Sequence, residues 1–206
     1  MKSVAFIANG QIDSVDAIKP LVLKHERVIA VDGGLVYCEK MGIRPDLIVG
    51  DFDSCPEGLL RQYEDVPKKH LAKEKDETDL EAAIEEARKK GFEKGTVFGG
   101  WGRRIDHSLT NALLLARFPG VLSLETENEV VFAIAKRVEI ECFAGQTLSL
   151  IPLSGPADGI TTKGLKWELK EGRLDQQFIG VSNLCLGAKA EIRIKSGALL
   201  CSLLKS

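Results

Sequence analysis

Residues 27–51 read RVIAVDGGLVYCEKMGIRPDLIVGD, and this stretch decides the fold class. The runs RVIAV and LIVG are short, apolar and rich in β-branched residues, as buried strands are, whereas residues 35–41 between them predict a helix. Two strands joined by a helix form a βαβ unit, in which the strands run parallel. The sequence therefore predicts an α/β fold with helices packed on a mostly parallel sheet, that is, a three-layer domain.

The same alternation continues on both sides of this stretch, over residues 1–124. VAFIA and TVFGG predict further strands, and helices are expected near residues 16–25 and over the segments TDLEAAIEEARKKG and SLTNALLLARF. Thr78 and Glu81 are spaced as a capping box, and Gly91 is a stop signal. The first of these segments places Leu80, Ala83, Ile84 and Ala87 on one face; the second places Leu109, Ala112, Leu113 and Ala116 on one stripe.

The helical period ends after about residue 126. Short runs such as VVFAI, VEIECF, TLSLIPL and AEIRIK then alternate or stay apolar between glycine-rich turns. In AEIRIK, Ile192 and Ile194 share a face while the charged residues take the other, as in a sheet with one wet side. We therefore expect an α/β domain over residues 1–125 and an all-β domain over residues 126–206.

Composition excludes several classes of protein. The chain has 206 residues, and its 28 Lys and Arg nearly balance its 30 Asp and Glu, so no field draws it to nucleic acid or to an anionic membrane. Its five cysteines are scattered, which argues against a disulfide framework and a zinc site and favours a reducing, cytoplasmic location. No run suits a signal peptide or a membrane span.

Polar or glycine residues follow four of the predicted strands. In parallel sheets, ligands bind outside the carboxyl ends of the strands, so these positions are the candidate ligand contacts. They are Asn9-Gly10, Asp32-Gly33-Gly34, Asp51 with Asp53, and Gly99-Gly100. We expect the glycines to let a ligand approach the backbone.

Asp51 and Asp53 are separated by one residue in the stretch LIVGDFDS. If the backbone stays extended, both carboxylates can face one cation, and Mg²⁺ prefers oxygen ligands and bridges them to phosphates. The alternative is an Asx-type turn, in which the aspartates accept local backbone N–H bonds. The two interpretations are equally compatible with this motif alone.

Asp76 and Asp79 form a second acidic pair in KDETDLEAA. Acids in the first turn of a helix stabilise its dipole and need no ligand. Beside Asp51 and Asp53, however, they could complete a cage of four acids, with Lys73 or Lys75 available for phosphate.

GGWGRRIDHSLTN places Arg103, Arg104, Asp106 and His107 at a predicted strand-to-helix junction, where backbone N–H groups favour anions. Arginine suits bidentate phosphate contacts. His107 is expected to begin the helix or to make a structural hydrogen bond rather than to act as a general base. The stretch lacks the third glycine of a dinucleotide fingerprint.

Taken in order, AVDGGL, GIRPDLIVGDFDS, KDETDLEAAI and GGWGRRIDHSLTN resemble the motifs of the thiamine pyrophosphokinase family, and TTKGLKWEL and IGVSN resemble segments of its β domain. The resemblance covers most of the chain. It implies an N-terminal α/β domain, a C-terminal β-sandwich and a homodimer with each active site between subunits. It also implies transfer of the pyrophosphoryl group of ATP to thiamine, with AMP as the other product.

The resemblance assigns roles by motif. It implies Mg²⁺ held by Asp51, Asp53, Asp76 and Asp79, with Arg104 near the triphosphate and Asp106 near thiamine. The expected catalytic residues are Asp51, Asp53, Asp79, Arg104 and Asp106. The expected ATP-binding residues are Asn9, Asp32, Gly33, Gly34, Lys75, Thr78, Gly100, Arg103, Arg104 and His107. Arg103 departs from the usual glycine, so either arginine could contact phosphate.

Thiamine is an aromatic cation, and Trp167 in GLKWEL is a candidate for stacking against it. A buried core tryptophan is an equally good interpretation. Ser182 and Asn183 could hydrogen-bond the pyrimidine or form a turn.

Two other functions remain open at this point: a magnesium-dependent transferase that accepts a different alcohol, and a nucleotide-sensing module without catalysis.

Overall fold

The computed structural model describes residues 2–74, 76–153 and 155–205, and the chain divides into two compact units. The first unit contains Met1–Ser108 and Leu124–Glu127, and the second contains Leu109–Ser123 and Asn128–Ser206. The predicted domain boundary at residue 125 falls where the two units interleave along the chain. That the segments on the two sides of this boundary are separate domains stays a prediction.

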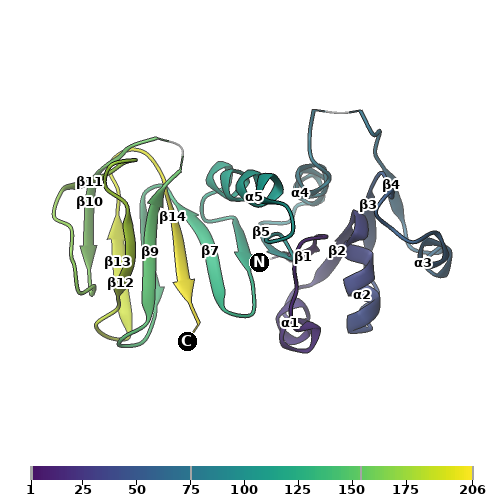
Figure 1. Ribbon diagram of the computed structural model, residues 1–206, viewed down its shortest axis with the longest axis horizontal. Coiled ribbons are helices and arrows are strands. Elements are labelled where there is room, and N and C mark those ends of the chain that lie inside the picture. Colours follow the sequence, from purple (N-terminus) through teal and green to yellow (C-terminus); the bar gives the residue numbers. More distant parts are fainter. Residues whose placement is uncertain (1, 75, 154, 206) are drawn as a thin grey trace. The chain divides into compact units, whose positions relative to one another are not determined.

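The first unit is built on a parallel sheet with the strand order β5-β1-β2-β3-β4 (Figure 1). The strands are β1 (Ser3–Ile7), β2 (Arg27–Val31), β3 (Leu47–Gly50), β4 (Lys68–His70) and β5 (Lys94–Phe98). The predicted βαβ unit is confirmed, since β2 and β3 flank α2 and pair in parallel. The short strand β4, with its sequence KKH, was not predicted because it lacks an apolar run.

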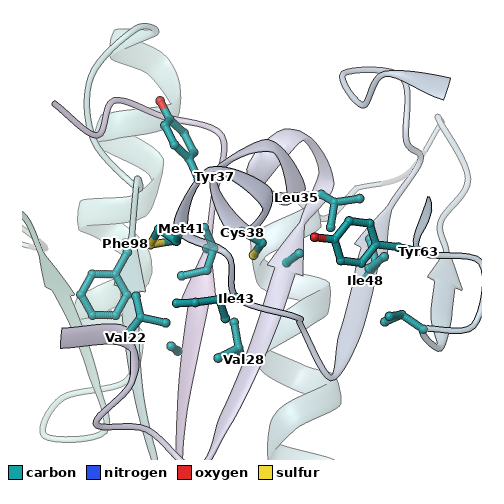
Figure 2. Packing of buried hydrophobic residues seen from close by; sticks show 14 of the residues in the cluster. Val22, Val28, Leu35, Tyr37, Cys38, Met41, Ile43, Ile48, Tyr63 and Phe98 are labelled. Carbon is teal, nitrogen blue, oxygen red and sulfur yellow. The ribbon is translucent and has the colours of Figure 1, made fainter. Parts of the chain in front are cut away.

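The helices are α1 (Val15–Val22), α2 (Leu35–Met41), α3 (Glu57–Gln62), α4 (Asp79–Lys89) and α5 (Ile105–Arg117), and a 3₁₀ turn, η1 (Asp32–Gly34), precedes α2. Ala5 and Ile7 of β1 pack in one apolar cluster with residues of α1 and α2, part of which Figure 2 shows. Val4 and Phe6 are also buried but point to the opposite face, where α4 contacts β1, β2 and β3. Helices thus cover both faces of the sheet, as the sequence predicted.

The predicted face of α4 is confirmed, because Leu80, Ala83, Ile84 and Ala87 are all buried. Thr78 caps this helix, and its Oγ1 accepts a hydrogen bond of 3.2 Å from the N–H of Glu81. The chain leaves the helical path at Gly91, which has a φ of 80°.

Two helix predictions were wrong in detail. The helix expected over residues 16–25 ends at Val22, because the backbone tightens into a turn in which the N–H of His25 bonds to the carbonyl of Val22. In α5, Leu109 and Leu113 are 55% and 49% exposed. Leu114 and Leu115 are buried instead. Three consecutive leucines surround most of the helix, so their spacing could not identify the buried face.

The second unit contains two antiparallel sheets, with strand orders β12-β9-β14-β7 and β11-β10-β13-β8. The strands are β7 (Glu129–Ile134), β8 (Arg137–Glu141), β9 (Thr147–Pro152), β10 (Ala157–Lys163), β11 (Gly172–Leu174), β12 (Gly180–Leu184), β13 (Lys189–Arg193) and β14 (Leu199–Leu204). Strand β6 (Leu122–Glu125) lies where the two units interleave.

Both sheets of the second unit contribute to one apolar core, so the unit is a β-sandwich as predicted. Leu148 comes from one sheet and Ile160 and Ile192 from the other, and all three are fully buried. The alternation predicted for AEIRIK is confirmed: Ile192 and Ile194 are buried while Arg193 and Lys195 are exposed. Among the described residues, no helix is long and apolar enough to span a membrane.

Candidate active site

The polar segments that follow β1, β2, β3 and β5 all leave the sheet at its carboxyl edge, because these strands are parallel neighbours. The segments after β1 and β5 bond directly to each other. The N–H of Gly10 donates to the carbonyl of Gly99 over 2.6 Å, and that of Gln11 donates to Trp101 over 2.6 Å. This edge of the first unit is the candidate active site.

The glycines at this edge serve the protein's own packing. A Cβ on Gly34 would lie 1.8 Å from the carbonyl oxygen of Ile7, and one on Gly33 would lie 2.4 Å from the Asn9 amide nitrogen. A Cβ on Gly100 would meet Val97 at 2.8 Å. Neighbouring protein atoms therefore occupy the space that a side chain would need at these positions. The expected approach of a ligand to their backbone stays a prediction.

Three carboxylates converge at the candidate active site. Each of Asp32, Asp51 and Asp79 contributes one carboxylate oxygen to a group of three oxygens that lie within 4.8 Å of one another. Asp32 is only 9% exposed, its φ is 47°, and its Oδ1 has no hydrogen-bond partner in the part of the chain that the structure describes. Burial raises the pKa of Asp32 above its ordinary value, and the negative charges of Asp79 and Asp53 add to the rise. We call these three residues the acidic cluster.

The backbone of the DFDS segment is not extended, contrary to the condition set for a shared cation. Phe52 has a φ of 67°, which turns the chain between the two aspartates. Asp51 Oδ1 accepts a hydrogen bond of 3.1 Å from the N–H of Asp53, as in the Asx-type alternative. The turn separates the two side chains: Asp51 joins the acidic cluster, whereas Asp53 accepts a bond from Ser54 and lies 4.0 Å from Lys73.

The KDETD segment contributes unequally to the site. Asp79 at the start of α4 belongs to the acidic cluster. Asp76, like Asp53, lies outside the cluster that the described residues form, and Asp76 is exposed. Thr78 uses its hydroxyl oxygen as the helix cap, and Lys75 lies outside the described residues. The metal and nucleotide roles expected of this segment stay predictions, while Asp32 is a cluster member that the sequence assigned to ATP only.

Arg103 and Arg104 point to different partners. Arg103 donates to Asn9 Oδ1 over 3.2 Å and to the Tyr37 hydroxyl over 3.1 Å. Arg104 holds both oxygens of Asp106, at 3.1 and 2.6 Å. The Arg104 guanidinium, together with the N–H of His107, lowers the pKa of Asp106 to about 2. A carboxylate with so low a pKa is a weak proton acceptor, so the expected contribution of Asp106 is binding rather than base catalysis.

The second unit contains a pocket of about 360 Å³ beside Trp167. Its lining includes the apolar residues Leu150, Trp167, Leu169, Leu174, Phe178, Ile179 and Val181. Trp167 is 56% exposed, so it is not a core residue as one interpretation held. The Lys166 ammonium lies 4.7 Å from the centre of the Trp167 ring, which shows that a cation can sit on this ring.

Asn183 supports the backbone of Trp167. Its Oδ1 accepts from the Trp167 N–H at 3.1 Å, and its Nδ2 donates to the Trp167 carbonyl at 2.8 Å. Ser182 is exposed at an irregularity in the pairing of β12 with β9, and it has a φ of 59°. Direct contacts of Ser182 and Asn183 with a ligand stay predictions.

Comparison with known proteins decides the family. Residues 18–130 match the family described as "Thiamin pyrophosphokinase, catalytic domain", and residues 131–199 match "Thiamin pyrophosphokinase, vitamin B1 binding domain". The chain belongs to the thiamin pyrophosphokinase family. The resemblance drawn from the sequence motifs is thereby confirmed.

Individual thiamine pyrophosphokinases agree over nearly the whole length. The Bacillus subtilis enzyme is 28% identical over 97% of this chain and 97% of its own sequence. A crystal structure of Thiamine pyrophosphokinase from Bacillus subtilis superimposes with a TM-score of 0.88 at 26% identity, covering 98% of this chain and 99% of that one. The yeast Thiamin Pyrophosphokinase shares the fold at 18% identity, with a TM-score of 0.82 over 98% of this chain and 86% of that one.

Proposed function

We propose that this chain transfers the pyrophosphoryl group of ATP to the hydroxyl group of thiamine, giving thiamine diphosphate and AMP. The acidic cluster carries the proposal. Carboxylates within 4.8 Å of one another, one of them buried with an unpartnered oxygen, repel each other unless a cation joins them. Membership of the family supplies the substrate class.

The donor set of the acidic cluster suits Mg²⁺, which prefers carboxylate oxygens and keeps part of its water shell. Asp32, Asp51 and Asp79 would hold the ion, and Asp53 and Asp76 remain candidates for a second ion or for ordered water. When bound, Mg²⁺ would neutralise charge on the triphosphate. The unpartnered Oδ1 of Asp32 favours this interpretation over a set of helix and turn caps, because such a cap would be occupied by a backbone N–H.

The residues around the cluster would bind and orient ATP. Lys73 and Arg104 are exposed cations at the same edge of the sheet, and each is paired with an aspartate. Both pairs are exposed and therefore weak, so phosphate oxygens can compete for the cations. Arg103, Thr78 and Asn9 would act mainly by holding the loops that surround the nucleotide.

In this reaction the thiamine hydroxyl oxygen attacks the β-phosphorus, and the bond from that phosphorus to the oxygen it shares with the α-phosphate breaks. AMP leaves with that oxygen, and the hydroxyl proton passes to a carboxylate or to water. Such transfers depend on positioning and charge neutralisation more than on a strong base. Asp106 is a weak proton acceptor for this step, because Arg104 holds the pKa of Asp106 at about 2.

Thiamine would bind at the pocket beside Trp167. The pocket is largely apolar, and the Trp167 ring already faces one cation, so its surface suits the thiazolium of thiamine. The Lys166 ammonium has to move, or thiamine has to use the other face of the ring. Asn183 would fix the tryptophan backbone. Ser182 is a further candidate for a hydrogen bond to thiamine.

We also propose that the active protein is a homodimer, cytoplasmic in location, in which each site combines the acidic cluster of one subunit with the Trp167 pocket of the other. Mixing two inactive variants tests this arrangement. Asp51→Asn and Trp167→Ala should each be inactive alone, and the mixed, re-equilibrated pair should recover about a quarter of wild-type activity. No recovery, despite subunit exchange seen by mass spectrometry, would contradict a site shared between subunits.

The decisive test of the reaction identifies both products. Purified protein incubated with ATP, Mg²⁺ and thiamine should form thiamine diphosphate and AMP in equal amounts, as measured by mass spectrometry. A transferase for another alcohol would form AMP with that acceptor and not with thiamine. A sensing module would bind ATP without forming AMP, which would overturn the proposal.

A further inference from the structure

Arg103 lies in the loop between β5 and α5, in a backbone conformation that side chains seldom adopt. Its φ is 59°, and the preceding Gly102 has a φ of 80°. A residue with a Cβ is strained in this left-handed region, so such a conformation persists only where surrounding contacts stabilise it. The contacts of the Arg103 side chain supply this stabilisation.

The Arg103 guanidinium connects two neighbouring segments of the first unit. One nitrogen donates to Asn9 Oδ1 at 3.2 Å, and another donates to the Tyr37 hydroxyl at 3.1 Å. The guanidinium carbon also lies 5.9 Å from the centre of the Tyr37 ring. Both hydrogen-bonding partners are neutral, so salt screens these contacts less than it screens a surface ion pair.

Tyr37 extends the same network to the loop that follows β1. It belongs to α2 and is 5% exposed, and its hydroxyl donates to the carbonyl of Gly10 at 2.9 Å. Figure 2 shows its hydroxyl directed away from the apolar cluster in which the other labelled side chains pack. The N–H of Gly10 bonds in turn to Gly99, in the segment that leads to Arg103. The network thus closes on itself through β1, α2 and β5.

We propose that Arg103 is a positioning residue for the nucleotide: through Tyr37 and Asn9 it fixes the loops after β1 and β5, and it leaves phosphate contact to Arg104. The inference rests on the proposed function, and it decides between the two arginines that the sequence left equivalent. The turn at Arg103 directs the side chains of two consecutive arginines toward different partners. Arg103 bonds to Asn9 and Tyr37, whereas Arg104 bonds to Asp106.

Lysine cannot replace Arg103 in this role. The planar guanidinium reaches Asn9 and Tyr37 with two separate nitrogens, whereas a lysine ammonium is a single point donor on a flexible stem. If Arg103 instead contacted phosphate as a charge, lysine would preserve much of its contribution. The pair Arg103→Lys and Arg103→Gly therefore separates the two roles.

The experiment uses Arg103→Gly, Arg103→Lys, Tyr37→Phe and the double variant Arg103→Gly/Tyr37→Phe. Glycine adopts the left-handed φ freely, so the loop keeps its path while the guanidinium is lost. Arg44→Ala is the matched control, because Arg44 also lies over a buried tyrosine, at 5.3 Å from the Tyr63 ring, but in the loop before β3 at the opposite edge of the sheet.

Amide hydrogen exchange without ATP gives the first readout. We expect faster exchange at Gly10 and Gln11 in Arg103→Gly and in Tyr37→Phe, and no change in Arg44→Ala. This measurement needs no substrate, so it tests the network even if the proposed reaction fails. Unchanged exchange in both network variants would overturn the inference.

Steady-state kinetics gives the second readout, in wild-type protein shown to form AMP with thiamine. Arg103→Gly, Arg103→Lys and Tyr37→Phe should each raise the KM for ATP about fivefold, the equivalent of one ordinary hydrogen bond, with a smaller change in kcat. The double variant should be within about twofold of the worse single variant, because both act through one network. If the KM increases of the two single variants multiply in the double variant, or if Arg103→Lys has a normal KM for ATP, Arg103 contacts phosphate and the inference is overturned.

Discussion

Replacing Asp32 by asparagine should stabilise the metal-free protein while it abolishes catalysis. Asparagine has nearly the same shape as aspartate and removes the buried negative charge from the acidic cluster. At an effective dielectric constant of about 20, two unit charges 4.8 Å apart repel by about 3.5 kcal/mol. Asp51 and Asp79 are only partly buried, so solvent screens part of this repulsion. We expect the free energy of unfolding to rise by about 1–3 kcal/mol.

Thermal unfolding in a chelating buffer of low ionic strength measures this effect. A gain of that size corresponds to a rise in Tm of roughly 3–10 °C for a chain of this length. Added Mg²⁺ should raise the Tm of the wild-type protein, since a ligand that binds only the folded state stabilises it. The Tm of Asp32→Asn should respond much less. Its turnover should fall by about 100-fold or more, because the weakened site would no longer hold the Mg²⁺ that neutralises charge on the reacting phosphates.

The control is Asp16→Asn, which removes an exposed aspartate from the first turn of α1, outside the cluster. There the negative carboxylate interacts favourably with the positive end of the helix dipole, so its loss should lower the free energy of unfolding by about 0.3–1 kcal/mol. The two asparagine variants should therefore shift stability in opposite directions. A destabilised Asp32→Asn, or one that responds to Mg²⁺ as the wild type does, would refute the assignment of the acidic cluster as a cation site.

Three further predictions test the packing, the helix capping and the burial of residues in the first unit. Gly34→Ala should destabilise the protein by about 1–3 kcal/mol or prevent folding, because its Cβ would meet the Ile7 carbonyl at 1.8 Å; a normal Tm would contradict the close approach. Thr78→Ala should lose about 1 kcal/mol of unfolding free energy with the cap of α4, whereas Thr78→Ser should keep it; equal losses in urea denaturation would exclude capping. Burial lowers the pKa of His25 below 6.5, so the unfolded chain binds a proton more readily and wild-type stability should fall as pH drops below about 6.5. Denaturation curves measured between pH 7 and 5 should show that the free energy of unfolding falls less in His25→Gln than in the wild type. An equal fall in both proteins would exclude His25 as the cause.

The fold was readable from the sequence because its two halves differ in hydrophobic period. The local sequence pattern identifies buried parallel strands such as LIVG and the strongly amphipathic helix α4. It does not identify strand β4, because KKH forms a strand only through its pairing with β3. The buried face of α5 also escaped prediction, since the consecutive leucines allow several faces and tertiary packing selects one.

The location of the candidate site was predictable, but its internal arrangement was not. Parallel topology brings the strand ends together, so Asp32, Asp51 and Asp79 could be placed at one edge from the sequence. Which aspartates converge depends on φ values of 47° at Asp32 and 67° at Phe52. Left-handed conformations at residues other than glycine are maintained by long-range contacts and leave no signature in the local sequence.

The close approach at Gly33 and Gly34 bears on how distant relatives of this chain can be interpreted. A copy that had lost catalysis would still need both glycines, because a Cβ there would strike Asn9 or the Ile7 carbonyl whether or not a nucleotide ever binds. If a divergent sequence retains both glycines, this indicates that the chain keeps the fold and does not indicate that it keeps the activity. Under the proposed function, the adjacent carboxylate at position 32 is the better marker of retained catalysis, because it belongs to the acidic cluster.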